Sequence, residues 1–307
     1  MVANGQYVFT VKATLVAAVN AWIADESTAT VTYGLINTWD VSAITDMQDL
    51  FAGVAHQSTF NGDISSWNVS SVTNMRRMFY DAYAFNIDIS SWDVSSVTNM
   101  DSMFSFYYAS GGAFNQDIGG WNVGSVTNMR RMFVSAIVFN QDISAWDVSS
   151  VTNMDTMFSY ARAFDQDISG WNVGSVTNMG SMFYTAIAFN QDISGWDVSS
   201  VTSMSYMFKS ASSFNQQLTW NVCGKSVTSM FDGTPGASAS MCPTSAPVIA
   251  PTMAPTHQPT GQPTGQPTGQ PRSTNWSTNY NTNRSTNIST NCNTNMSTNI
   301  STNTCTT

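Results

Sequence analysis

The side chains with the clearest potential for chemistry are aspartates that recur at one place in a repeated F-[ND]-x-D-I segment. Carboxylate oxygens are ligands that Ca²⁺ prefers, so a column of them could form a row of weak calcium sites. Alternatively, each carboxylate accepts backbone N–H bonds from its own turn and needs no metal. We expect the turn arrangement and keep calcium as the alternative for Asp117, Asp142, Asp167 and Asp192.

Catalysis would require a nucleophile beside a base, or two carboxylates in different environments. The chain has only two histidines, His56 and His257, and nearly every carboxylate recurs at equivalent places in other repeats. A unique active site is difficult to build from such material. We therefore expect no enzymatic activity and no cofactor.

The charge balance restricts the partners. Nineteen acidic and ten basic residues give a net charge of -9 and a pI near 4.3. A chain without an evident basic patch is not expected to bind nucleic acid or an anionic membrane surface. No run of about 18 apolar residues is present, so no membrane span is expected. The first residues also lack the pattern of a secretory signal.

Eight tryptophans, 24 to 29 residues apart, mark the starts of eight repeats of about 25 residues. A single repeat cannot bury its own aromatic and methionine side chains, whereas stacked repeats share a continuous core. The tryptophans are therefore predicted to be core residues, above all Trp67, Trp92, Trp121, Trp146, Trp171 and Trp196.

The spacing of apolar residues predicts the elements of each repeat. Met154, Met157, Phe158 and Ala161 have the offsets 0, 3, 4 and 7 of a short amphipathic helix. Alternation over residues 168–173 predicts a short strand. One short strand and one short helix per coil of about 25 residues predict an α/β solenoid of leucine-rich-repeat type with about eight coils.

The position after each tryptophan alternates between aspartate and asparagine, so no two aspartates are neighbours in the stack. This alternation avoids repulsion between like charges about 5 Å apart. Charges in the predicted helix alternate too: Arg76 and Arg77 are followed by Asp101, and the next coils repeat this order. We expect ion pairs between neighbouring coils. The binding surface is predicted on the strand face, at Asp93, Asn122, Asp147, Asn172 and Asp197.

The ends of the chain differ from the repeats. We expect a helical cap at 1–36, the repeat solenoid at 37–220, a second cap at 221–242, a linker rich in Pro, Thr and Gln at 243–272 and a low-complexity tail at 273–307. Cys223 and Cys242 are predicted to form a disulfide, which would imply an oxidising compartment. The glycosylation candidates in N-x-[ST] motifs are Asn68, Asn275, Asn283, Asn287, Asn295 and Asn299.

The unit FNQDISxWDVSSVTNMxxMFxxA, found at 139–161 and, with Ser203 in place of the asparagine of VTNM, again at 189–211, closely resembles the repeat of BspA-like leucine-rich-repeat surface proteins. The resemblance covers about residues 37–232. It implies an exported solenoid on a cell surface or in the extracellular space, used for adhesion or protein binding.

Together these observations favour a non-catalytic scaffold that binds an unknown protein or carbohydrate ligand. The alternative function is a passive structural spacer of a cell wall or extracellular matrix. We expect a monomer, because stacking satisfies the apolar face of each repeat within one chain.

Overall fold

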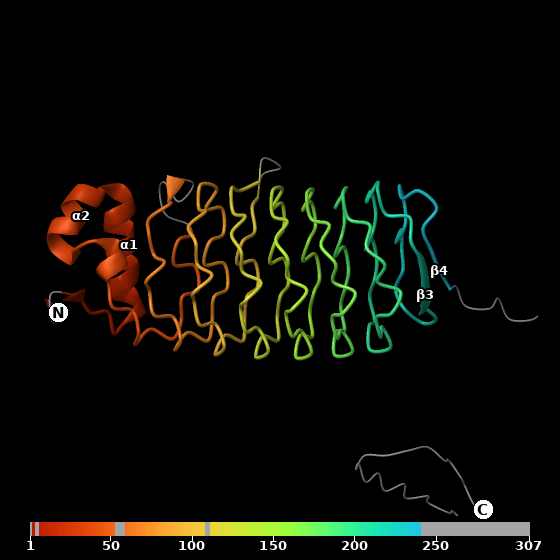
Figure 1. Cartoon of the computed structure of the whole chain (residues 1–307), viewed down its shortest axis with the longest axis horizontal. Helices are drawn as coiled ribbons and strands as arrows, with labels where there is room; N and C mark the ends of the chain where they lie inside the picture. The colour runs from red at the N-terminus through yellow and green to blue at the C-terminus, as the bar shows by residue number, and fades with distance from the viewer. Residues whose placement is uncertain (1, 4–5, 53–58, 108–110, 241–307) are drawn as a thin grey trace, which may run out of the picture. The chain divides into compact units, whose positions relative to one another are not determined.

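The computed structural model of the chain describes residues 2–3, 6–52, 59–107 and 111–240. Met1–Val248 group into one compact unit, in which successive coils lie side by side along one axis (Figure 1). None of the helices formed by the described residues is both long and apolar enough to cross a bilayer.

The N-terminal end of the stack is covered by helices. Strands β1 (Val2–Ala3) and β2 (Gln6–Tyr7) pair antiparallel and precede helix α1 (Lys12–Ala24), helix α2 (Glu26–Tyr33) and a 3-10 turn, η1 (Ile36–Thr38). Helix α1 buries Leu15, Ala18 and Val19, so it protects the first coil from solvent. Helix α2 begins because the Asp25 carboxylate accepts the Thr28 backbone N–H at 3.2 Å.

Neighbouring coils are joined by a parallel backbone ladder. Parallel bridges connect residues at the same place in each repeat, in the order Asp46, Asn74, Asn99, Asn128, Asn153, Asn178, Ser203 and Ser226. In one coil, the N–H groups of Met154, Thr156 and Phe158 donate to carbonyls of the next coil at 2.8–3.0 Å. The ladder satisfies the backbone of a segment whose apolar side chains are buried.

The segment predicted as a helix forms two consecutive β-turns. Met157 N–H donates to the Met154 carbonyl and Ala161 N–H to the Phe158 carbonyl, and the third residues of these turns, Thr156 and Tyr160, have φ of 61° and 58°. A positive φ at this place is typical of a type II turn. Two such turns in series bury residues at offsets 0, 3, 4 and 7, which is why the spacing resembled that of a helix.

The segment predicted as a strand, residues 168–173, is also different. Trp171 N–H donates to the Ile168 carbonyl at 3.1 Å, so the chain turns there. The alternating apolar residues reflect burial of Ile168, Trp171 and Val173 on the inside of a turn. The inter-coil ladder instead runs through the segment with the methionines.

The core is one continuous cluster of aligned side chains. Phe133, Phe158 and Phe183 are stacked with ring centroids 5.5 and 5.7 Å apart, and equivalent rings continue in both directions. From Trp67 to Trp220, the indole N–H groups of the tryptophan column bond to isoleucine carbonyls, as Trp146 Nε1 does to the Ile118 carbonyl at 3.0 Å. Burial and this bond together fix the register of neighbouring coils.

At the C-terminal end, strand β3 (Gln217–Asn221) pairs parallel with strand β4 (Ser238–Ser240). Cys223 lies two residues after the end of β3 and is disulfide-bonded. Cys242 lies outside the described residues, so its pairing with Cys223 stays a prediction.

Candidate functional site

The residues predicted as a binding surface lie in exposed turns and not on a strand. The side chain of each accepts the backbone N–H of the residue two positions later, as in the bond from Ser95 N to Asp93 Oδ1 at 3.1 Å. The same bond is formed by Asn122, Asp147, Asn172 and Asp197. These side chains therefore cap their own turns, and one oxygen of each is already used.

The hydrogen bonds affect the acidity of the aspartates in this column. The Ser95 hydroxyl donates to Asp93 and, with the Ser95 backbone N–H, lowers the pKa of that carboxyl below its ordinary value. For Asp197 the backbone N–H of Ser199 is the largest cause of the lowered pKa. The ionised form is thus the one that fits these turns.

The four aspartates of the calcium alternative have the same arrangement. Asp117, Asp142, Asp167 and Asp192 each accept a backbone N–H two residues later at 2.9–3.0 Å. Among the residues with described positions, no group of three or more His, Cys, Asp or Glu side chains is placed to hold a metal ion. Local capping accounts for these carboxylates without a cation.

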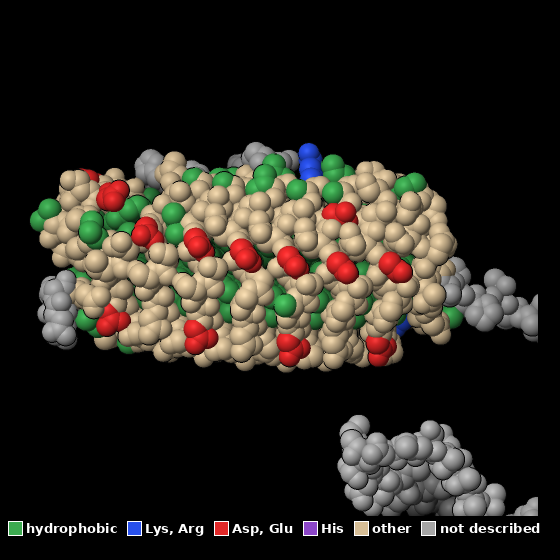
Figure 2. All heavy atoms as spheres, in the orientation of Figure 1, with side chains coloured by type: hydrophobic (Ala, Val, Ile, Leu, Met, Phe, Trp, Pro, Cys, Tyr) green, Lys and Arg blue, Asp and Glu red, His purple; other side chains and the backbone are tan. Residues whose placement is uncertain are grey.

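Figure 2 shows two rows of acidic side chains along one face of the stack, one with a carboxylate in every coil and one in every second coil. This periodicity is that of the F-[ND]-x-D-I column and of the alternating column after tryptophan. We call this face the acidic side.

The tryptophan column does not contribute to the surface. Trp67, Trp92, Trp121, Trp146, Trp171 and Trp196 are each only 3–4% exposed. Their indole N–H groups donate to isoleucine carbonyls of the preceding coil. These rings cannot stack on a ligand.

The charges in the M-x-x-M turns form the most distinctive site. A hollow of about 400 Å³ crosses four neighbouring coils and contains four of the ten basic residues of the chain. We call it the arginine groove; its principal side chains are those of Arg76, Arg77, Arg130, Arg131, Tyr80 and Tyr160. In the coils at Met75 and Met129, the short turn between two buried methionines places two arginines on this face, whereas the equivalent residues of the coil between them, Asp101 and Ser102, are buried.

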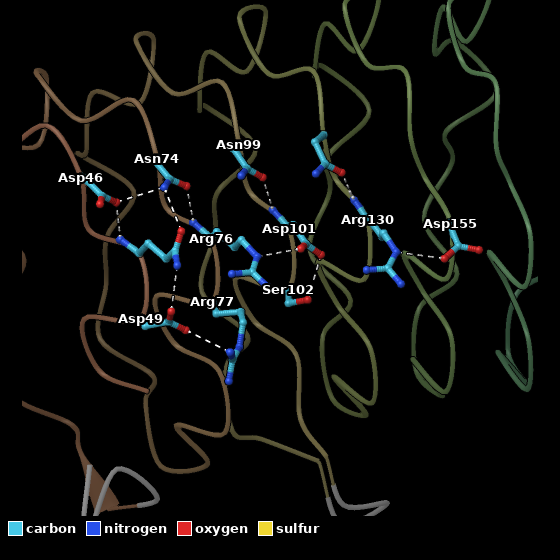
Figure 3. Close-up of polar contacts among 12 residues, drawn as sticks. Asp46, Asp49, Asn74, Arg76, Arg77, Asn99, Asp101, Ser102, Arg130 and Asp155 are labelled. Carbon is cyan, nitrogen blue, oxygen red and sulfur yellow. Dashed lines mark hydrogen bonds and ion pairs between the residues drawn. The ribbon is translucent and has the colours of Figure 1, made fainter. Parts of the chain in front are cut away.

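Ion pairs between coils hold part of the groove (Figure 3). Arg76 Nε lies 3.1 Å from Asp101 Oδ2, and Arg130 Nε lies 3.2 Å from Asp155 Oδ2. The side chain of Asp101 is only 9% exposed and also accepts the Ser102 hydroxyl at 2.9 Å. The pairing predicted from the alternation of charges is therefore confirmed for Arg76 and Arg130.

The second arginine of each pair is held differently. The Arg77 guanidinium lies 4.4 Å from the ring centroid of Tyr80 and its Nη1 is 3.3 Å from Asp49 Oδ1, an ion pair without the alignment of a hydrogen bond. Arg131 is exposed and has no ion-pair partner among the described residues. Burial is the largest cause of the raised pKa of Tyr80.

The sequence predicts a binding surface on the acidic side and, for these arginines, only ion pairs. The net charge of -9 does not reveal that four guanidinium groups lie close together in the arginine groove. The signal that could have found it is the Arg-Arg pair repeated two coils apart, at residues 76–77 and 130–131.

The glycosylation candidates can be placed for one residue only. Asn68 is exposed, and its side chain accepts the Ser70 backbone N–H at 3.1 Å. Asn275, Asn283, Asn287, Asn295 and Asn299 lie outside the described residues.

Comparison with known proteins gives one family and one repeat type. A model of a disordered PT repeat matches residues 239–275, where the linker was expected. No curated protein and no solved structure matches the chain. Three overlapping matches, at 21–134, 105–187 and 139–241, are to a family described as "Mycoplasma protein of unknown function, DUF285", and together they cover more than half of the chain. The chain therefore belongs to this DUF285 family.

Proposed function

We propose that this protein is a non-catalytic scaffold, displayed on a cell surface or secreted, that binds a protein or glycan ligand. The observation that carries the proposal is the arginine groove. Four guanidinium groups gather on two coils of an acidic chain that are separated by one further coil, and carboxylates of adjacent coils hold three of them. Asp49, Asp101 and Asp155 offset part of this charge, but the exposed Arg131 has no ion-pair partner among the described residues, which favours a binding site over a passive spacer.

The finer family relationship belongs to the same proposal. The repeated FNQDIS and SSVTNM segments support a BspA-like relationship and a solenoid of leucine-rich-repeat type. The disulfide bond of Cys223 supports export, since disulfides persist in oxidising compartments.

The alternative function, a passive spacer, predicts a different result in the same experiment. The full chain would be immobilised and probed with arrays of extracellular proteins and glycans, with the heat-denatured chain as control. The scaffold should bind a restricted set of ligands reproducibly, and only when folded. Signals that are absent, or equal for the denatured chain, would support the spacer.

A further inference from the structure

We propose that the arginine groove binds an acidic glycan, a saccharide chain that carries carboxylate or sulfate groups. The inference rests on the binding function proposed above and assigns it a site and a ligand class. Three observations support it: the orientation of the guanidinium groups, the spacing between them, and the hydrogen bonds that already occupy the backbone around them.

The first argument is that two guanidinium groups are fixed in orientation. The ion pairs of Arg76 and Arg130 engage Nε, and within the described residues their Nη groups have no hydrogen-bond partner. Because Asp101 is nearly buried, the Arg76 head group cannot move without exposing that pair. A fixed, planar guanidinium donates two parallel hydrogen bonds to a carboxylate or sulfate.

The second argument is spacing. Coils joined by a parallel ladder are about 4.8 Å apart, so the pair Arg76 and Arg77 lies roughly 10 Å from the pair Arg130 and Arg131. One small anion cannot reach both pairs. A polymer with anionic groups along its length can contact both, and each additional contact raises the effective affinity.

The third argument separates a glycan from an acidic peptide. An extended peptide is commonly recognised by strand addition, which requires unpaired backbone groups. Here the ladder uses them: Arg77 N–H donates to the Asp101 carbonyl at 2.9 Å, and Arg131 N–H donates to the Asp155 carbonyl at 3.0 Å. Recognition must therefore use side chains, and the groove offers guanidinium groups with the rings of Tyr80 and Tyr160. Tyrosine rings, which have an apolar face and a polar hydroxyl, suit a saccharide when guanidinium groups lie beside them.

The acidic side makes the proposal specific to one face. Its carboxylates are exposed and, like any aspartate of ordinary or lowered pKa, ionised at neutral pH. They repel a polyanion, so an acidic glycan should bind only where the arginines gather.

The experiment measures binding of the full chain to dextran sulfate, to a polyuronate, to uncharged dextran and to poly-glutamate in low salt. We expect binding to at least one of the two acidic glycans and none to dextran. The stronger of dextran sulfate and polyuronate identifies sulfate or carboxylate as the preferred group. Affinity should fall as salt rises, since the contacts are partly exposed.

Variants locate the site. Arg131→Gln should weaken binding about tenfold, because charge-assisted hydrogen bonds are lost. Arg131→Lys keeps the positive charge but lacks the planar guanidinium, so this variant should bind with intermediate affinity. Lys225→Gln removes the same charge near the acidic side, where Lys225 bonds to the Ser199 carbonyl, and should bind normally. Arg131 is exposed, and thermal melting of each variant checks that the stack is intact.

Four results would overturn the inference. Equal losses of glycan affinity in Arg131→Gln and Lys225→Gln would show that binding depends on net charge alone. Poly-glutamate binding that depends on Arg131, without binding of either glycan, would assign the groove to an acidic peptide. An array ligand that is insensitive to Arg131→Gln, with neither acidic glycan bound, would reject this site but retain the scaffold function. An array without any ligand, with neither glycan bound, would reject the scaffold function itself.

Discussion

The acidic side and the side with the M-x-x-M turns are built from the same coils but hold their backbone differently. On the acidic side, Asp93 and its equivalents cap their own turns. On the other side, the third residue of each turn has a positive φ although it is not glycine, as at Arg77 (52°) and Arg131 (57°). Such conformations cost of order 1–3 kcal/mol each and are common at functional sites.

The two kinds of side chain act over different distances along the stack. A capping aspartate or asparagine stabilises its own coil, so a cap of this kind can recur in every repeat. Arg76, Arg77 and Arg130 pair with carboxylates in a neighbouring coil, so their surface exists only where several coils are stacked. A single repeat contains all the residues of a capped turn, whereas the ion-paired arginine surface requires residues from at least two repeats.

The largest effect is expected from the core that both sides share. Trp146→Ala removes a buried ring and its bond to the Ile118 carbonyl, and should lower the free energy of unfolding by about 3–5 kcal/mol. Trp146→Phe, the matched control, keeps a ring and should lose less. Chemical denaturation measures both variants. Equal stability of Trp146→Ala and the unchanged chain would contradict a core that is continuous between the two sides.

A smaller effect on stability should distinguish residues with positive φ from the other residues of a coil. Thr156 has φ of 61°, where a β-branched residue is strained, so Thr156→Gly should raise the free energy of unfolding by up to about 1 kcal/mol. Thr152 is in the same coil but is not among the residues with positive φ. Thr152→Gly is the control and should destabilise the chain, since glycine loses more entropy on folding. Similar losses in the two variants would indicate that the turn is not strained.

The smallest effect concerns the acidic side and pH. The pKa values of Asp93, Asp142 and Asp192 are lowered from 3.8 by hydrogen bonds from the serines two residues later. A folded pKa below the unfolded value stabilises the fold above about pH 4, and this stabilisation is lost as pH falls through the lowered values. The melting temperature should be nearly constant from pH 7 to 5 and then decline. A decline that is complete before pH 5 would exclude these carboxylates as its cause.

The sequence was sufficient to predict several features of the molecule. Burial of Trp146 and its equivalents followed from their spacing, and the pairing of Arg76 with Asp101 followed from the alternation of charge. The elements within a coil could not be predicted, because offsets of 0, 3, 4 and 7 from Met154 fit one helix or two successive turns equally well. Only the positive φ at Thr156 and Tyr160 separates these structures.

The arginine groove could not be predicted for a different reason. Arg76 and Arg130 belong to separate repeats, and the outward direction of both depends on a turn that the spacing does not reveal. Once that turn is known, the two Arg-Arg pairs fall on one face without further assumptions.

The alternation between neighbouring coils restricts how such a protein can change in length. Removing the single coil that contains Asn122 would bring Asp93 next to Asp147, and it would take Arg130 away from Asp155. Removing two adjacent coils preserves both relationships. Duplications and deletions in the gene should therefore be tolerated most readily in pairs of repeats, which makes the pair the unit of evolutionary growth.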